Sequence, residues 1–214
     1  PSLALANARH EVAHLAEVVS GMLDRFLDQS RGEDPGLADD LASLEKKTNA
    51  LEGEILHYLS ALNAEDFTKE ESRQHHALLI ATDTLESVAD IISRDLLRTR
   101  TRISDASLNV SETMADLARA LSDEVAACLA KTVDVVREDD AALAVEILGH
   151  RTVVDQQIEK AYRHHEKRFR ESSSHRIESF RLEMTFINEL RNIYTLIQRV
   201  AATSLPEDTE DRDF

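Results

Sequence analysis

The sequence predicts an all-α protein, made of six long antiparallel helices that form two tandem three-helix bundles. The chain has 5 Gly and 3 Pro among 214 residues, where average usage gives roughly 25 of the two together, so turn material for a many-stranded sheet is scarce. Apolar residues recur at steps of three and four through most of the chain, which is the pattern of amphipathic helices. The order of predicted helices repeats with a period of about 105 residues, too long for a solenoid unit.

Three helices are predicted in the first half. The first ends near Ser30 to Gly32. Asp34 as N-cap and Pro35 at the first helical position open the second. Thr68 and Glu71 have capping-box spacing and open the third, which reaches about Arg102. The three apolar stripes are Val12, Leu15, Val19, Met22 and Phe26; Leu37, Leu41, Leu44, Leu51, Ile55 and Leu62; and Leu78, Thr82, Leu85, Ala89, Ile92 and Leu96.

Three further helices follow a polar joint at 104–111. The pair Asp139 and Asp140 separates the fourth helix from the fifth, and the serines at 172–174 separate the fifth from the sixth. We therefore predict one repeat over 1–103 and a second over 104–203, followed by an acidic, disordered tail at 204–214. The stripes are Met114, Leu117, Leu121, Val125, Cys128, Thr132 and Val135; Leu143, Ile147, Val154, Ile158 and Ala161; and Ile177, Phe180, Met184, Ile187, Leu190, Tyr194, Ile197 and Ala201.

Charge and composition exclude several classes of function. The net charge is −16, with 41 acidic against 25 basic residues, so nucleic acid is not an expected partner. Cys128 stands alone and cannot form an internal disulfide, which favours a cytosolic setting. No stretch approaches the ~18 to 20 uncharged apolar residues that cross a bilayer. The chain also lacks a glycine-rich phosphate loop and a Ser-His-Asp or Cys-His pattern, so we do not expect an enzyme.

An HExxH motif stands at His10, Glu11 and His14. Two histidines at i and i+4 on one helical face are zinc ligands in metallopeptidases, with the glutamate as general base. Such enzymes also need a third ligand and an edge strand for the substrate, and no strand is predicted. We therefore interpret the motif as a solvated helix face.

A pair of carboxylates at i and i+4 is the stronger candidate for a metal site. Glu86 and Asp90 project from one face of the third helix, where like charges repel by a few tenths of a kcal/mol. Arg94, four residues after Asp90, offers an ion pair as the simpler interpretation. An antiparallel neighbour with Glu45 and Asn49 could instead complete an oxygen-rich site for Mg²⁺, Ca²⁺ or iron.

Two basic clusters lie at predicted helix C-termini. Complementarity to the helix dipole and solubility explain such clusters in most proteins. The functional alternative is a face held near anionic phospholipid headgroups or near an acidic partner. The clusters are Arg98, Arg100 and Arg102, and Arg163, His164, His165, Lys167, Arg168 and Arg170.

Several segments resemble one family over nearly all of residues 1–203. The opening PSLALANARHEVAHLAEVVSGML, the helix LEKKTNALEGEILHYLSAL, residues 67–72 and above all LESVADI resemble the PhoU-like domain that follows the membrane-spanning part of bacterial sodium/phosphate cotransporters of the NptA type. In that family each PhoU repeat is a three-helix bundle. The resemblance therefore implies the same architecture as the periodicity.

The resemblance also implies metal ligands. PhoU proteins bind multinuclear metal clusters, of divalent or ferric ions, through E/DxxxD motifs, and Glu86 and Asp90 match that motif directly. Glu45 and Asn49 match it in part, since an Asp is usual at the second place. In the second repeat Asp155 aligns with Asn49, whereas Arg151 takes the place of Glu45. Arg191 and Thr195 take the places of Glu86 and Asp90, so the second cluster is expected to be lost.

By this resemblance the chain is a regulatory domain on the cytoplasmic side of the plasma membrane, where it modulates sodium-driven uptake of inorganic phosphate. Its expected partner is the membrane-spanning transporter, in the same polypeptide, and a homodimer is a second candidate assembly. One alternative is a free-standing PhoU-type negative regulator of a phosphate ABC transporter and its sensor kinase. Another is a helical scaffold with no role in phosphate physiology.

Overall fold

The computed structural model describes residues 2–29, 34–63, 67–108, 110–168 and 174–206, and these residues are helical apart from short turns. The first half contains α1 (Ser2–Gln29), α2 (Leu37–Ser60) and α3 (Lys69–Asp90), which continues through the π-helical η2 (Ile91–Leu96) into α4 (Leu97–Asp105). The second half contains α5 (Glu112–Glu138), α6 (Ala141–Gly149), α7 (Arg151–Arg168) and α8 (Ser174–Ala202). With α3 to α4 and α6 to α7 each counted as one interrupted helix, the predicted all-α fold with six long helices is confirmed.

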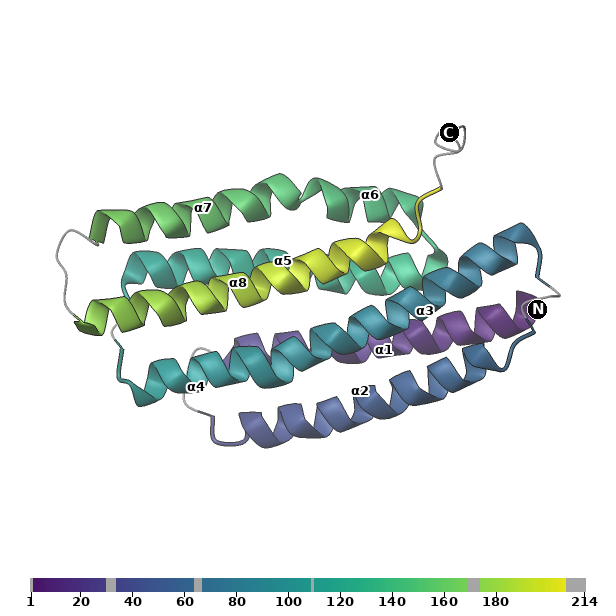
Figure 1. Ribbon diagram of the computed structural model, residues 1–214, viewed down its shortest axis with the longest axis horizontal. Helices are drawn as coiled ribbons and strands as arrows, with labels where there is room; N and C mark the ends of the chain where they lie inside the picture. Colours follow the sequence, from purple (N-terminus) through teal and green to yellow (C-terminus); the bar gives the residue numbers. More distant parts are fainter. Residues whose placement is uncertain (1, 30–33, 64–66, 109, 169–173, 207–214) are drawn as a thin grey trace.

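The helices of the two halves lie side by side along the long axis of the molecule (Figure 1). In the first half α1, α2 and α3 contact one another, and in the second half α5, α6, α7 and α8 do so. The halves meet where α1 packs on α5 and α3 packs on α8. Helices α2 and α7 consequently lie at opposite edges of the bundle (Figure 1). The division at 103 and 104 stays a prediction, because buried residues of both halves belong to one hydrophobic cluster.

Helix α1 lies at the centre of this arrangement because its apolar surface is wide. Its buried residues include consecutive positions such as Val12 with Ala13 and Leu15 with Ala16, all at most 1% exposed. Such a surface is wider than the single stripe that one neighbour needs. It accounts for simultaneous contact with α2, α3 and α5.

Two of the predicted helix starts illustrate how local chemistry sets the boundaries. At α3, Glu71 N–H donates to Thr68 Oγ1 at 3.2 Å and Thr68 N–H donates to Glu71 Oε2 at 2.9 Å, so the predicted capping box is confirmed. At α2 the predicted cap is wrong, because the helix begins at Leu37 with Gly36 at the N-cap position. Asp34 Oδ1 accepts the Gly36 N–H at 2.8 Å and closes a turn before the helix.

Of the two aspartates between α5 and α6, the first ends α5 and the second begins α6. Asp139 ends α5 in the left-handed conformation, at φ 54°. Asp140 caps α6, where its Oδ1 accepts the N–H groups of Ala142 and Leu143 at 2.8 and 3.0 Å. The predicted punctuation at this pair is confirmed, and it allows a very short connection.

Most stripe residues are buried as predicted, and six are only partly buried against the core: Leu44, Leu51, Leu62, Leu117, Leu143 and Phe180. Ile177, near the start of α8, is 47% exposed instead of buried, and the predicted fifth helix is broken at His150 into α6 and α7. The π-helical turn of η2 adds one residue to the register of the third helix at Ile91–Leu96. Residues 207–214, most of the predicted acidic tail, lie outside the described residues. None of the described helices combines the length and the apolar character that a bilayer crossing requires.

A carboxylate lies half-buried where α4 meets α8. Thr99 Oγ1 donates to Glu189 Oε1 at 2.8 Å, whereas Glu189 Oε2 is buried without a hydrogen-bond partner among the described residues. Burial raises the pKa of Glu189 from 4.5 to about 7, against the lowering effect of the Thr99 hydrogen bond. The folded protein therefore holds a proton that the unfolded chain releases above about pH 4.5.

This proton makes stability depend on pH. Between pH 4.5 and 7 the unfolded chain loses the Glu189 proton first, so the contribution of Glu189 to the free energy of unfolding falls as pH rises through this window. We predict that Glu189→Gln raises the free energy of unfolding at pH 8 by about 1 to 2 kcal/mol, after allowance for solvent screening. Urea unfolding at pH 5 and pH 8 measures this, with Glu178→Gln on the exposed face of α8 as control. A gain of equal size at both pH values would contradict the account.

Candidate functional site

The predicted carboxylates of the first repeat come together on one face of the bundle. Glu45 and Glu52 lie on α2, and Glu86 and Asp90 lie on the adjacent α3. Glu86 and Glu52 are each close enough to Asp90 for its charge to affect their ionisation. The structure thus brings Glu45, Glu86 and Asp90 together as the spacing predicts, and adds Glu52, which the sequence argument did not single out.

The guanidinium of Arg94, which projects from η2, bridges the two helices. Its Nη1 donates to Asp90 Oδ2 at 2.8 Å, and its Nε donates to Glu45 Oε1 at 2.9 Å. The ion pair between Asp90 and Arg94 that the i to i+4 spacing predicted is therefore present. Glu45 of α2 is a second carboxylate partner of the same guanidinium. We name Glu45, Glu52, Glu86, Asp90 and Arg94 the acidic face.

The electrostatics of the acidic face favour a cation. Burial raises the pKa of Glu86, and the charges of Asp90 and Glu52 raise it further, while Arg94 opposes them. Burial also raises the pKa of Glu52, with Asp83 and Asp90 adding to the effect. Asp90 Oδ1 is buried and accepts no hydrogen bond from the described residues. These groups suit a divalent cation in charge and donor type, and the Arg94 guanidinium already occupies the position between Glu45 and Asp90.

The other two candidate ligands differ in their positions. Asn49 is exposed on α2 between Glu45 and Glu52, so it lies beside the acidic face. Asp155 lies on α7, and this helix is at the opposite edge of the bundle from α2 (Figure 1). Its Oδ2 is 3.7 Å from Arg151 Nε. Thr195 and Arg191, in the places of the first-repeat carboxylates, form a hydrogen bond from the Thr195 hydroxyl to the Arg191 carbonyl at 3.0 Å. Metal binding by Glu45, Asn49, Glu86, Asp90 and Asp155 stays a prediction.

The HExxH residues do not converge. His10 and Glu11 line a groove of about 600 Å³ between α1 and α2, together with Tyr58 and Glu54 of α2. His14 Nδ1 instead lies 3.4 Å from Glu17 Oε2. No strand occurs beside the motif in the described part of the chain.

Only some residues of the two basic clusters lie on the surface. Arg98 pairs with Asp95 at 3.1 Å, and the Arg100 guanidinium carbon lies 5.9 Å from the centre of the Phe26 ring. His165 is 5% exposed, with its Nε2 3.1 Å from Glu183 Oε2, so it belongs to the interior. The side chains of Lys167 and Arg168, and the whole of Arg170, lie outside the described residues.

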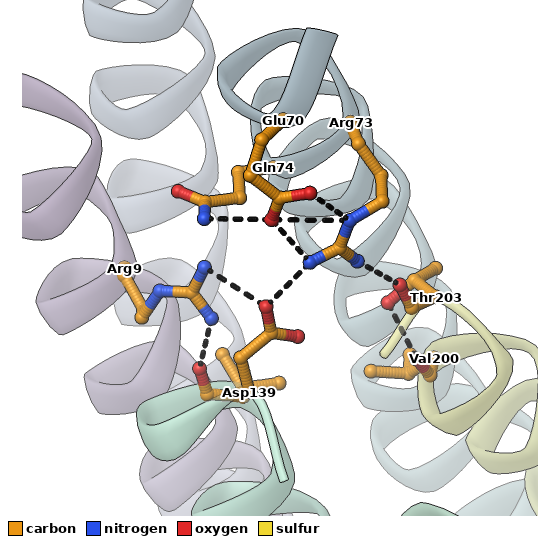
Figure 2. A network of polar contacts seen from close by, with 8 residues as sticks. Arg9, Glu70, Arg73, Gln74, Asp139, Val200 and Thr203 are labelled. Atoms are coloured by element: carbon orange, nitrogen blue, oxygen red, sulfur yellow. Dashed lines mark hydrogen bonds and ion pairs between the residues drawn. The ribbon is translucent and has the colours of Figure 1, made fainter. Parts of the chain in front are cut away.

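A polar network that sequence reasoning missed joins both repeats near one end of the bundle (Figure 2). Arg73 of α3 donates to Asp139 Oδ2 at 2.8 Å and to the Thr203 carbonyl, just past α8, at 3.1 Å. Arg9 of α1 donates to the Val136 carbonyl at 3.3 Å, and its Nη2 lies 3.6 Å from Asp139 Oδ2. The Asp139 carboxylate at the end of α5 therefore contacts α1 and α3 directly, and α8 is linked to it through Arg73.

Glu70 completes the network on the α3 side. It accepts hydrogen bonds from Arg73 Nη2 at 2.7 Å and from Gln74 Nε2 at 3.0 Å, and these lower the pKa of Glu70 to about 2 (Figure 2). Periodicity does not reveal the network because the partners that join the two repeats are 66 to 130 residues apart. The Asp139 position at a predicted helix break was the available signal.

Comparison with known structures defines the fold class. The crystal structure of PhoU from Pseudomonas aeruginosa superposes on 95% of this chain with a TM-score of 0.83, at 16% sequence identity, and 96% of that chain is covered. The chain therefore has the PhoU fold. The sequence profile of the PhoU domain matches residues 12–99, which contain the acidic face.

The chain is also similar in sequence to part of two longer proteins. The chain is similar to YjbB of Salmonella typhimurium, a protein named for a proposed role in inorganic phosphate export, at 25% identity over 220 residues. It is 25% identical to YjbB of Escherichia coli K12 over 222 residues. Both matches cover 100% of this chain and 39% of the relative. The resemblance to PhoU is thus confirmed for the fold and, in sequence, for residues 12–99, and the cotransporter part stays a prediction.

We predict that Arg94 and a divalent cation compete for the same oxygens. Arg94→Ala frees Glu45 and Asp90, so Mn²⁺ should bind the acidic face at least about fivefold more tightly, a gain of about 1 kcal/mol. Titration calorimetry measures this, with Arg98→Ala as control. Glu86→Ala combined with Asp90→Ala should remove the gain while helicity stays intact. Equal Mn²⁺ affinity in the wild type and Arg94→Ala would contradict the site.

A second prediction concerns the network at Asp139. Asp139→Asn keeps a side chain that tolerates the left-handed conformation and removes the charge shared by Arg9 and Arg73. It should lower the free energy of unfolding by about 1 to 3 kcal/mol, measured by urea denaturation. Asp134→Asn, at an exposed site on the same helix, should change it by less than about 0.5 kcal/mol. Equal effects of the two substitutions would show that the network contributes no stability.

Proposed function

We propose that this chain is a regulatory domain that controls the movement of inorganic phosphate across the cytoplasmic membrane, acting on a membrane-spanning transporter from its cytoplasmic side. The observation that carries the proposal is the alignment of the entire chain with 39% of the YjbB proteins, whose name concerns phosphate export. In those relatives the equivalent segment belongs to a longer polypeptide. The proposal therefore includes a transporter region in the same polypeptide as the regulatory domain.

The charge of the chain supports a regulatory role over direct handling of phosphate. A net charge of −16 gives no long-range attraction for a phosphate anion. The same charge, concentrated in part on the acidic face, suits cations. A domain of this kind acts on phosphate movement by its conformation or its contacts with the transporter.

Helix α3 offers a physical connection within such a domain. It carries Glu86 and Asp90 of the acidic face and also Glu70 and Arg73 of the network that joins the two repeats. Asp90 lies 17 residues after Arg73, which corresponds to about 25 Å of helix. A cation that displaces Arg94 on the acidic face would act on the same rigid element that holds the network.

The direction and coupling of transport are separate from this proposal. The resemblance in sequence implies sodium-driven uptake, whereas the name of the relatives concerns export. A free-standing regulator of a phosphate ABC transporter and its sensor kinase is the second candidate. It is favoured by the structural match, since the chain covers 96% of the Pseudomonas aeruginosa PhoU chain.

We predict that loss of the gene changes phosphate flux in the native cells. Uptake and release of radiolabelled phosphate are measured in wild-type cells, in a deletion strain and in a complemented strain, with and without a sodium gradient. Net flux should change at least about twofold in one direction and return on complementation. Sulfate flux is the control. Phosphate flux that is unchanged under both phosphate limitation and excess would contradict the proposal and favour a scaffold outside phosphate physiology.

A further inference from the structure

A second cluster of ligand-type side chains lies in the second repeat, away from the acidic face. Glu124 Oε1 contacts His150 Nδ1, and one ligand atom from each of Glu124, Cys128 and His150 lies within 4.8 Å of the others. Glu124 and Cys128 are four residues apart on α5, so both project from the same face of that helix. His150 comes from the break between α6 and α7.

We propose that Glu124, Cys128 and His150 form a binding site for a zinc-type transition metal ion. One thiolate, one imidazole and one carboxylate are a mixed ligand set that suits Zn²⁺, whereas Mg²⁺ and Ca²⁺ require oxygen ligands. Three protein ligands leave the fourth tetrahedral position for water. The inference is independent of the proposed function.

The geometry requires small adjustments. With metal–ligand bonds of about 2.0 to 2.3 Å, ligand atoms of a tetrahedral site lie roughly 3.3 to 3.8 Å apart. The three ligand atoms already lie within 4.8 Å of one another. Side-chain rotations that shift a ligand atom by about an ångström would bring them to that spacing.

The surrounding contacts hold the histidine in place. His150 N–H donates to the Ile147 carbonyl at 3.2 Å, and Tyr194 Oη of α8 donates to the same carbonyl at 2.8 Å. Lys131 of α5 pairs with Glu146 of α6 at 2.9 Å and fixes the two helices one turn away. These bonds place the α6 terminus, and with it His150, against α5.

An ion also has a route to the site. Cys128 is 1% exposed and lies innermost, whereas the side chains of Glu124 and His150 are 23% and 34% exposed. An ion can therefore first meet the imidazole and the carboxylate at the surface and then reach the thiol. The alternative is a Glu–His contact beside a cysteine that serves as a small apolar side chain.

Cobalt(II) distinguishes these two interpretations, because a thiolate ligand gives Co²⁺ a near-ultraviolet charge-transfer band that carboxylate and imidazole ligands do not give. The metal-free 214-residue chain should bind one Co²⁺ with this band, and one equivalent of Zn²⁺ should remove it. Cys128→Ser should lose the band, and His150→Gln should weaken Co²⁺ binding at least tenfold. His14→Gln, in the exposed His14–Glu17 pair of α1, is the matched control and should bind as the wild type does.

Circular dichroism and thermal unfolding without metal verify that each variant is folded. His150→Gln lies at a half-exposed position, so it keeps the test valid if Cys128→Ser fails to fold. Absence of a thiolate band in the wild type would overturn the proposal. So would Co²⁺ binding that Cys128→Ser and His150→Gln leave unchanged, and this second result would place the ion at the acidic face or another carboxylate site.

Discussion

The packing of α1 against helices of both repeats is the contact on which the rest of the structure depends. Its buried residues cover more than one stripe, so α1 contacts α2 and α3 within its own repeat and α5 across the interface. The same interface sets α3 against α8. Because the two repeats share one hydrophobic cluster, the polar groups at the ends and edges have fixed positions relative to one another.

The charged groups follow from this framework. Packing of α2 on α3 collects like charges on the acidic face, where Arg94 offsets part of their repulsion. Packing of α1 on α5 and of α3 on α8 brings Arg9 of α1 and Arg73 of α3 to the Asp139 carboxylate at the end of α5. Helix α3 belongs to both groups, so it connects the acidic face to the junction between the two repeats.

Much of the fold could be predicted from the sequence, because helix periodicity and caps are local properties. The stripe of α1 and the Thr68–Glu71 capping box are examples. The predicted N-cap at Asp34 lies two residues before the observed N-cap at Gly36, since Asp-Pro-Gly forms a turn as readily as a helix start. Glu86 and Asp90 of the acidic face could be predicted because residues four apart lie on the same face of a helix. The Asp139 network and the Glu124, Cys128 and His150 cluster were not, because they depend on contacts between helices that are distant in sequence.

The central proposal is that this PhoU-fold domain acts on phosphate movement as part of a membrane protein. An immunoblot of fractionated native cells, with an antibody raised to this domain, tests that claim most directly. The account predicts a membrane-bound band well above the 24.0 kDa of this chain. A soluble band near 24.0 kDa would contradict the fused transporter and make the free-standing regulator the working hypothesis.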